Sequence, residues 1–146
     1  MFTSSKRFGP ISVAHRQWKS ESHCKYIHGY GRIIDITFHC KKRDEKGWVM
    51  DFGNLKEIKD WMFNIWDHSL LVAHDDPHRA DLWKLDQEGV LKLFIMPEAY
   101  GPGIEDSCKY IYDKVTEMIK IETDGRVGIK KVRIYEHEFN WAEYNG

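Results

Sequence analysis

The sequence predicts a single α+β domain in which helices cover one face of an antiparallel sheet. The length of 146 residues suits one domain and is too short for two. Short segments with β-branched or alternating apolar residues indicate strands, and two longer segments with apolar residues at helical spacing indicate helices. These segments follow one another in the order β-β-α-β-α-β, without a repeat or a linker. The order is typical of a four-stranded α+β domain, here covering residues 1–146.

Two strands are predicted in the N-terminal part of the chain. Residues 8–15 form the first strand, in which Ile11, Val13 and His15 share one face because side chains two apart point the same way. Residues 30–38 form the second strand, since this segment is rich in β-branched and aromatic residues.

The segments around these two strands are predicted to be irregular or short. Residues 1–7 form a loose arm, and residues 17–25 form a polar loop. The charged segment 42–47 ends in glycine and predicts a hairpin into a strand at residues 48–50. We expect that strand to pair antiparallel with the one before it.

Two amphipathic helices are predicted in the rest of the chain. Residues 54–67 repeat apolar side chains at helical spacing, and Asp51 or Asn54 can cap the first turn. The second helix begins after the break at residues 101–103 and carries Glu105 in its first turn, where the helix dipole favours an acid. The other predicted elements are a short helical piece at residues 76–86 and strands at residues 90–95 and 127–138.

The charge and cysteine content exclude several classes of protein. With 22 Lys and Arg against 23 Asp and Glu, the chain has no overall field that attracts nucleic acid or an acidic membrane. Its three cysteines include no Cys-x-x-Cys pair, which argues against a disulfide framework and favours a reducing cytoplasm. The N-terminal segment is mixed and polar, unlike a signal peptide or a membrane span. Aromatic residues make up 14% of the chain, which favours a subunit interface.

Several short motifs occur along the chain in one order. They are Val13-Ala14-His15-Arg16, Cys24 four residues before His28-Gly29, Gly47-Trp48-Val49-Met50-Asp51-Phe52 followed by Leu55-Lys56, Asp67-His68, Pro102 with Glu105, and Glu136 with Tyr144. Together they resemble the family of 6-pyruvoyltetrahydropterin synthases and 6-carboxytetrahydropterin synthases, over nearly the whole chain. The resemblance implies the tunnelling fold, in which subunits join their sheets edge to edge into a barrel, typically a hexamer made of two trimers. Such closure would bury unpaired strand edges.

The resemblance implies a zinc site at the end of the first strand. His15 and His28 would be ligands, since neutral imidazoles on neighbouring strands can converge on zinc and leave positions open for substrate oxygens. Without the resemblance they would be ordinary strand histidines. The family's usual motif is His-Gly-His, whereas this chain has Tyr30 in the third position. Tyr30 could supply a phenolate oxygen, or water or His23 could replace the third ligand, or that ligand could be lost.

The resemblance also implies the groups that move protons. Cys24, in a polar loop, is the candidate base, because a thiolate near cationic groups can take a proton from the substrate. Asp67 and His68 match the family's partner pair, in which the carboxylate orients the imidazole and the imidazole handles the second proton. Taken alone, this pair would be only a polar helix end.

The pterin would be held by carboxylates. Glu136 projects from a strand and can accept two hydrogen bonds from the amino group and ring N–H of a pterin. Glu105 matches a second family glutamate, although Gly103 and Ile104 before it lack the hydroxyl that the family pattern carries. A triphosphate would meet scattered residues such as Arg16, Lys25 or Arg32.

The resemblance thus implies a zinc-dependent lyase that acts on 7,8-dihydroneopterin triphosphate. The short loops around Cys24 favour 6-carboxytetrahydropterin as product, with release of triphosphate and acetaldehyde on the queuosine and deazapurine route. One alternative is 6-pyruvoyltetrahydropterin synthase. Another is a non-catalytic pterin-binding oligomer, which Tyr30 and the Gly103-Ile104 pair suggest.

Overall fold

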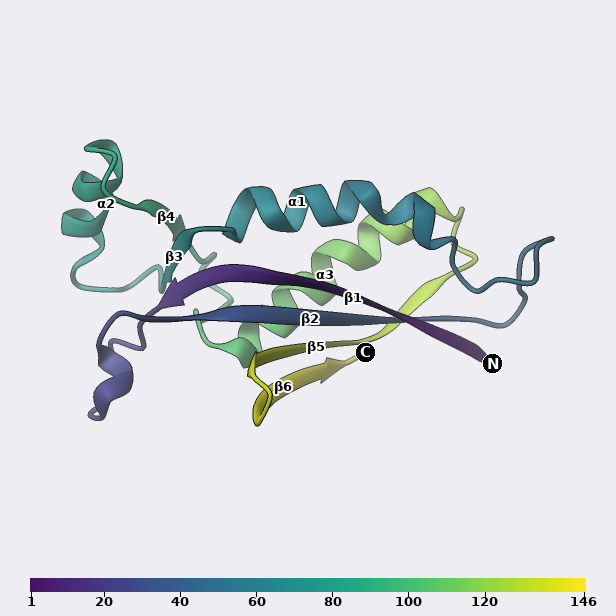
Figure 1. Ribbon diagram of the computed structural model, residues 1–146, viewed down its shortest axis with the longest axis horizontal. Coiled ribbons are helices and arrows are strands. Elements are labelled where there is room, and N and C mark those ends of the chain that lie inside the picture. Colours follow the sequence, from purple (N-terminus) through teal and green to yellow (C-terminus); the bar gives the residue numbers. More distant parts are fainter.

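A six-stranded mixed sheet forms the framework of the protein (Figure 1). The computed structural model describes residues 1–146. In chain order the strands are β1 (Phe2–His15), β2 (His28–Cys40), β3 (Ser69–Val72), β4 (Lys92–Ile95), β5 (Gly128–His137) and β6 (Asn140–Asn145). The helices are α1 (Lys56–Trp66), α2 (Arg79–Gln87) and α3 (Ile104–Glu122), with short 3-10 turns η1 (His23–Lys25) and η2 (Phe52–Leu55).

The strands lie in the order β4-β3-β1-β2-β5-β6. β1 and β2 form a long antiparallel pair whose register runs from Phe2 opposite Cys40 to His15 opposite His28. β5 and β6 continue the antiparallel part, whereas β3 and β4 are parallel to β1. Because β1 ends opposite the start of β2, the last core-facing residues of β1 and the first of β2 meet at one end of the sheet.

Helices α1 and α3 cover one face of the sheet and enclose the main core. Figure 1 shows both helices running along the same side of β1 and β2, with α2 near β3 and β4 at one end. Ile58, Met62 and Trp66 of α1 are buried in this core, as their helical spacing predicted. α2 packs on a smaller cluster, where Leu82 meets Leu70 and Val72. The two helices on one face therefore match the predicted α+β class, and α2 is a third helix outside the main core.

The prediction of a four-stranded antiparallel sheet is wrong, because the sheet has six strands and two of them are parallel to β1. Residues 2–7, expected to be a loose arm, pair with residues 35–40 of β2. β3 was missed because all four of its residues are buried, so its sequence shows no alternation. β6 is mostly polar and pairs only with β5, which the local sequence does not show.

Residues 48–50 do not form the predicted strand. The carboxylate of Asp44 accepts hydrogen bonds from the backbone of Lys46 at 3.0 Å and of Trp48 at 2.8 Å, which makes this segment a closed turn. Arg126 then donates to the carbonyl of Val49 at 3.0 Å and ties the turn to the start of β5. The free edge of β2 is taken by β5 instead.

The predicted helices are confirmed with small shifts at their ends. Asp51 caps η2 by accepting the backbone N–H of Gly53 at 2.9 Å, and α1 follows directly. The short helix predicted at residues 76–86 is α2. None of the helices combines the length and the apolar composition that crossing a membrane requires.

Candidate active site

Three rings gather where β1 ends and β2 begins. His15 and His28 lie directly opposite each other in the ladder, and their ring centroids are 4.5 Å apart. The ring of Tyr30 lies 5.7 Å from that of His28 and 6.3 Å from that of His15. His137 of β5 lies 6.0 Å from Tyr30 on the other side. The register therefore brings together the three residues that the sequence proposed as metal ligands.

Beneath these rings lies Arg32, whose side chain is fully buried. Its guanidinium donates to Ser107 Oγ at 3.0 Å, to the carbonyl of Pro102 at 3.2 Å and to His15 Nδ1 at 3.1 Å. Burial lowers the pKa of Arg32 to about 10, but the group remains a cation at neutral pH. Arg32 thus connects the imidazole cluster to the first turn of α3, 75 residues away from it in sequence.

The hydrogen bond from Arg32 determines which nitrogen of His15 carries the proton. A guanidinium can only donate, so His15 Nδ1 must accept and the proton of the neutral ring is on Nε2. Burial first, and then the positive charges of Arg32 and His28, lower the pKa of His15 to about 3. The ring therefore stays neutral over the physiological pH range.

His28 has the opposite arrangement. Its Nδ1 lies 2.6 Å from the carbonyl oxygen of Tyr26, which can only accept. The proton is therefore on Nδ1, and in the neutral ring Nε2 carries a free lone pair. The two neighbouring imidazoles are thus set as different tautomers, His15 by the Arg32 guanidinium and His28 by the Tyr26 carbonyl.

The residues present do not fit the zinc site that the family resemblance implied. Zinc needs an unprotonated nitrogen from each imidazole, whereas the only unprotonated nitrogen of His15 is occupied by Arg32. Burial, followed by the charges of Glu136 and Cys24, raises the pKa of Tyr30, which works against a phenolate ligand. Residues 1–146 contain no group of three or more His, Cys, Asp or Glu side chains that could hold a metal ion. His23 therefore does not complete a metal site with His15 and His28.

Cys24 lies beside the cluster. It sits in η1, and its backbone carbonyl accepts the N–H of Gln17 at 2.9 Å, which holds the loop against the end of β1. Its side chain is half-buried and close enough to raise the pKa of Tyr30. Cys40 and Cys108 are buried, and burial raises the pKa of the Cys108 thiol to about 12. Cys24 is thus the most accessible of the three thiols.

Two glutamates approach the cluster from other elements. Glu136 follows Val132 and Ile134 on the core face of β5, and its charge acts on both Tyr30 and Arg32. Glu105, in the first turn of α3, also acts on Arg32. Neither carboxylate forms a side-chain hydrogen bond or an ion pair, so both are free to meet a ligand.

Asp67 and His68 form the pair that the sequence suggested, but away from this cluster. Asp67 Oδ2 lies 3.0 Å from His68 Nδ1, and Asp67 Oδ1 accepts the N–H of Ser12 at 3.0 Å. His68 lines a shallow hollow with Ser12 and Ala14, which alternate with the buried Val13 and so belong to the opposite face of β1. Within one chain the pair and Cys24 therefore lie on different faces of the sheet.

Sequence reasoning missed the central role of Arg32, which it considered only as one possible phosphate contact. The available signal was its position, because Arg32 shares the face of Ile34, Ile36 and Phe38 on the second strand. A cation on a core face needs buried partners. Ser107, one of those partners, had no signal because a serine in an amphipathic helix is unremarkable in sequence.

The fold is similar to that of solved structures. An uncharacterized protein from Wolinella succinogenes superposes with a TM-score of 0.85 at 15% identity, covering 99% of this chain and 98% of that one. The 6-pyruvoyltetrahydropterin synthase of Plasmodium vivax superposes with a TM-score of 0.69 at 15% identity, covering 100% of this chain and 99% of that one. At this identity the similarity defines a fold, that of the 6-pyruvoyltetrahydropterin synthases.

The sequence defines the family. The model of the family described as 6-pyruvoyl tetrahydropterin synthase matches residues 4–146. The 6-carboxy-5,6,7,8-tetrahydropterin synthase of Rickettsia typhi is 35% identical over 134 residues, covering 91% of this chain and 93% of that protein. A protein of the same name from Rickettsia bellii is 38% identical over 67 residues, and the match spans about half of it, 49%. The chain belongs to the 6-pyruvoyl tetrahydropterin synthase family, as its motifs indicated.

Proposed function

We propose that the protein is a lyase that converts 7,8-dihydroneopterin triphosphate to 6-carboxytetrahydropterin, with loss of triphosphate and acetaldehyde. The observation that carries the proposal is the cluster in which the rings of His28 and Tyr30 lie together and the charges of Cys24 and Glu136 both act on Tyr30. Two relatives that match over nine-tenths of their length, from Rickettsia typhi and Aquifex aeolicus, carry the name of this activity. The queuosine and deazapurine route and a cytoplasmic location are part of this proposal.

Glu136 would hold the pterin head. A carboxylate at a sheet end can accept from the amino group and the neighbouring ring N–H at once, which gives a charge-assisted, two-point contact. The charge of Glu105 also acts on Arg32, and this side chain would bound the same site. The pterin side chain would then extend towards Cys24 and the imidazoles.

Cys24 would act as the base on the pterin side chain. It needs a second group to return the proton, and the Asp67-His68 pair is suited to this because the carboxylate orients the imidazole. The pair faces away from Cys24 in the same chain, so we propose that it serves the site of a second copy. No step of this scheme is assigned to zinc, because His15 does not fit as a ligand.

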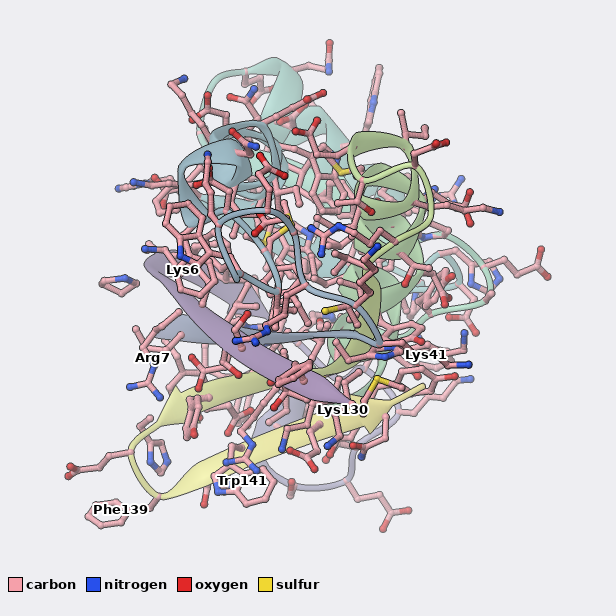
Figure 2. The ribbon with its side chains drawn as sticks, turned by 90° about the vertical axis from the view of Figure 1, so that its right-hand side faces the viewer. Lys6, Arg7, Lys41, Lys130, Phe139 and Trp141 are labelled. Carbon is pink, nitrogen blue, oxygen red and sulfur yellow. The ribbon has the colours of Figure 1, made fainter.

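A homo-oligomer, with a hexamer of two trimers as the expected form, would bring these faces together. The edges of β4 and β6 are free for pairing. Beside the β6 edge, Phe139 is 79% exposed and Trp141 is 48% exposed, and Figure 2 shows both at the lower margin of the molecule. Apolar rings at a free sheet edge favour a contact between subunits.

The test is incubation of the purified protein with 7,8-dihydroneopterin triphosphate, followed by mass spectrometry of the pterins and an assay for acetaldehyde. The expected result is 6-carboxytetrahydropterin and acetaldehyde in equal amounts. Formation of 6-pyruvoyltetrahydropterin without acetaldehyde would assign the protein to the alternative synthase. A non-catalytic pterin-binding oligomer is the second candidate, favoured by Tyr30 in place of an imidazole. Tight pterin binding without turnover would support it.

A further inference from the structure

We infer that the imidazole cluster is a metal-free site, in which Arg32 sets His15 as a hydrogen-bond donor and the Tyr26 carbonyl sets His28 as an acceptor. The ligand group that matches this arrangement is a hydroxyl, which can both accept and donate a hydrogen bond. A hydroxyl could accept from His15 Nε2–H and donate to His28 Nε2. This inference concerns the site itself and holds for any ligand, whether or not the proposed reaction is correct.

The first argument is the position of Arg32. Its side chain is fully buried under the cluster and has no ion-pair partner in the chain. A divalent metal on His15 would be placed next to this cation inside the protein, where charges are poorly screened. A site built to bind a metal would not hold a fixed guanidinium against one of its ligands.

The second argument is the cost of changing the tautomer. To offer a lone pair from Nε2, His15 would have to move its proton to Nδ1, which would then face the guanidinium donor at 3.1 Å. Arg32 Nε already has no hydrogen-bond partner. Losing the bond to His15 would leave a further buried N–H of the same side chain unpaired, which proteins avoid.

The third argument is Tyr30, which stands where the family's motif has its third histidine. Tyr30 stands two residues after His28 on the same face of β2, within 6.3 Å of the His15 ring. A protonated phenol is a hydrogen-bond donor and acceptor but a poor metal ligand. It therefore extends the polar group of His15 and His28 towards an oxygen-bearing ligand. Tyr30 and Arg32 thus both favour an oxygen-bearing ligand over a metal ion at this site.

His28 keeps the arrangement of a metal ligand, so the inability to bind metal is specific to His15 and Tyr30. Its Nδ1–H is held by a backbone carbonyl at 2.6 Å, which is the usual second contact of an imidazole that binds metal through Nε2. Only Tyr30 and Arg32 stand between this chain and a three-imidazole site. That makes the inference testable by restoring the site.

The experiment measures zinc directly. Wild-type protein from zinc-supplemented cells should contain well below one zinc per chain and should compete poorly with a chromogenic chelator. The double variant Tyr30→His/Arg32→Met adds the third imidazole and frees His15, so its zinc affinity should exceed that of the wild type by about 100-fold, the upper end of the change in metal affinity that altering the contacts of one ligand causes. The matched control Tyr30→Phe/Arg32→Met frees His15 without adding a ligand and should show a smaller gain, about 10-fold, because only two imidazoles can then reach the metal.

Stoichiometric, tightly bound zinc in the wild type would overturn the inference. So would equal zinc affinity in Tyr30→His and the double variant, because Arg32 would then have no effect. A second measurement needs no variant. Nitrogen NMR of histidine-labelled wild-type protein should show His15 protonated on Nε2 and His28 on Nδ1, and protonation of His15 on Nδ1 would contradict the inference.

Discussion

Arg16 and Asp76 form two parallel hydrogen bonds, at 2.7 and 3.0 Å, across 60 residues of sequence. The Asp76 side chain is completely buried, and its Oδ1 also accepts the backbone N–H of His78 at 2.9 Å. Arg16 follows His15 directly, so this ion pair anchors the end of β1 to the loop before α2. The position of the imidazole cluster depends on a contact outside the cluster.

We expect Asp76→Asn to destabilise the protein by about 3 to 5 kcal/mol, because it leaves the partly buried guanidinium of Arg16 without its counter-charge. The free energy of unfolding from urea denaturation measures this. Asp75→Asn is the matched control, since the Asp75 pair with Lys19 is exposed and should contribute about 1 kcal/mol or less. Equal effects of the two variants would show that Arg16 and Asp76 do not anchor the strand.

Cys24→Ala should bind the dihydropterin but lose turnover by roughly two to four orders of magnitude, the usual size of a general-base contribution. Product formation and pterin fluorescence titration separate the two effects. In the wild type, alkylation should reach Cys24 well before Cys40 or Cys108, which are buried, and substrate should protect it. Normal turnover of Cys24→Ala would make the Asp67-His68 pair the leading candidate for the base.

Glu136→Gln should weaken pterin binding by about 1.5 to 3 kcal/mol, because the amide keeps the shape of the side chain but loses the charged hydrogen bonds. Equilibrium dialysis with a non-reactive pterin measures the dissociation constant. Glu138→Gln, two residues further along and exposed in the turn after β5, is the control. If both variants bind as the wild type does, the pterin is held elsewhere.

The free energy of unfolding should decrease as the pH falls below about 6.5, in part because of His15. Its pKa is 6.5 when unperturbed and about 3 in the folded protein, so the unfolded chain binds one proton more between these values. The stabilisation is complete above about pH 6.5 and is lost towards pH 3, with a slope of about 1.4 kcal/mol per pH unit. Urea denaturation between pH 7 and 4 should show a shallower slope for His15→Asn, which can still accept from Arg32. An identical slope would mean that His15 is not neutral in the folded state.

The protein should form an oligomer at micromolar concentration, through the free edges of β4 and β6. Sedimentation velocity measures the mass, and a hexamer is the expected species. Phe139→Lys places a charge on the most exposed ring beside the β6 edge and should shift the distribution towards smaller species. A monomer of the wild type under these conditions would exclude the shared site proposed for Asp67 and His68.

Local patterns were sufficient for much of the fold. The helical spacing of Ile58, Met62 and Trp66 gave α1, and the β-branched run of residues 33–38 gave the centre of β2. Elements that depend on a distant partner were not predictable. Residues 2–7 become a strand only because β2 extends beside them, and residues 69–72 only because β1 and β4 flank them.

The sequence by itself determined the family and supplied the candidate site residues, since both depend on residue types and spacing along the chain. Only the tertiary structure decided how those residues act together. The tautomer of His15 depends on Arg32, which Ser107 and Pro102 hold from the start of α3, 70 or more residues away. Asp67 and His68 are separated from Cys24 because they lie on different faces of the sheet. Such contacts arise from packing between distant segments, and no local pattern encodes them.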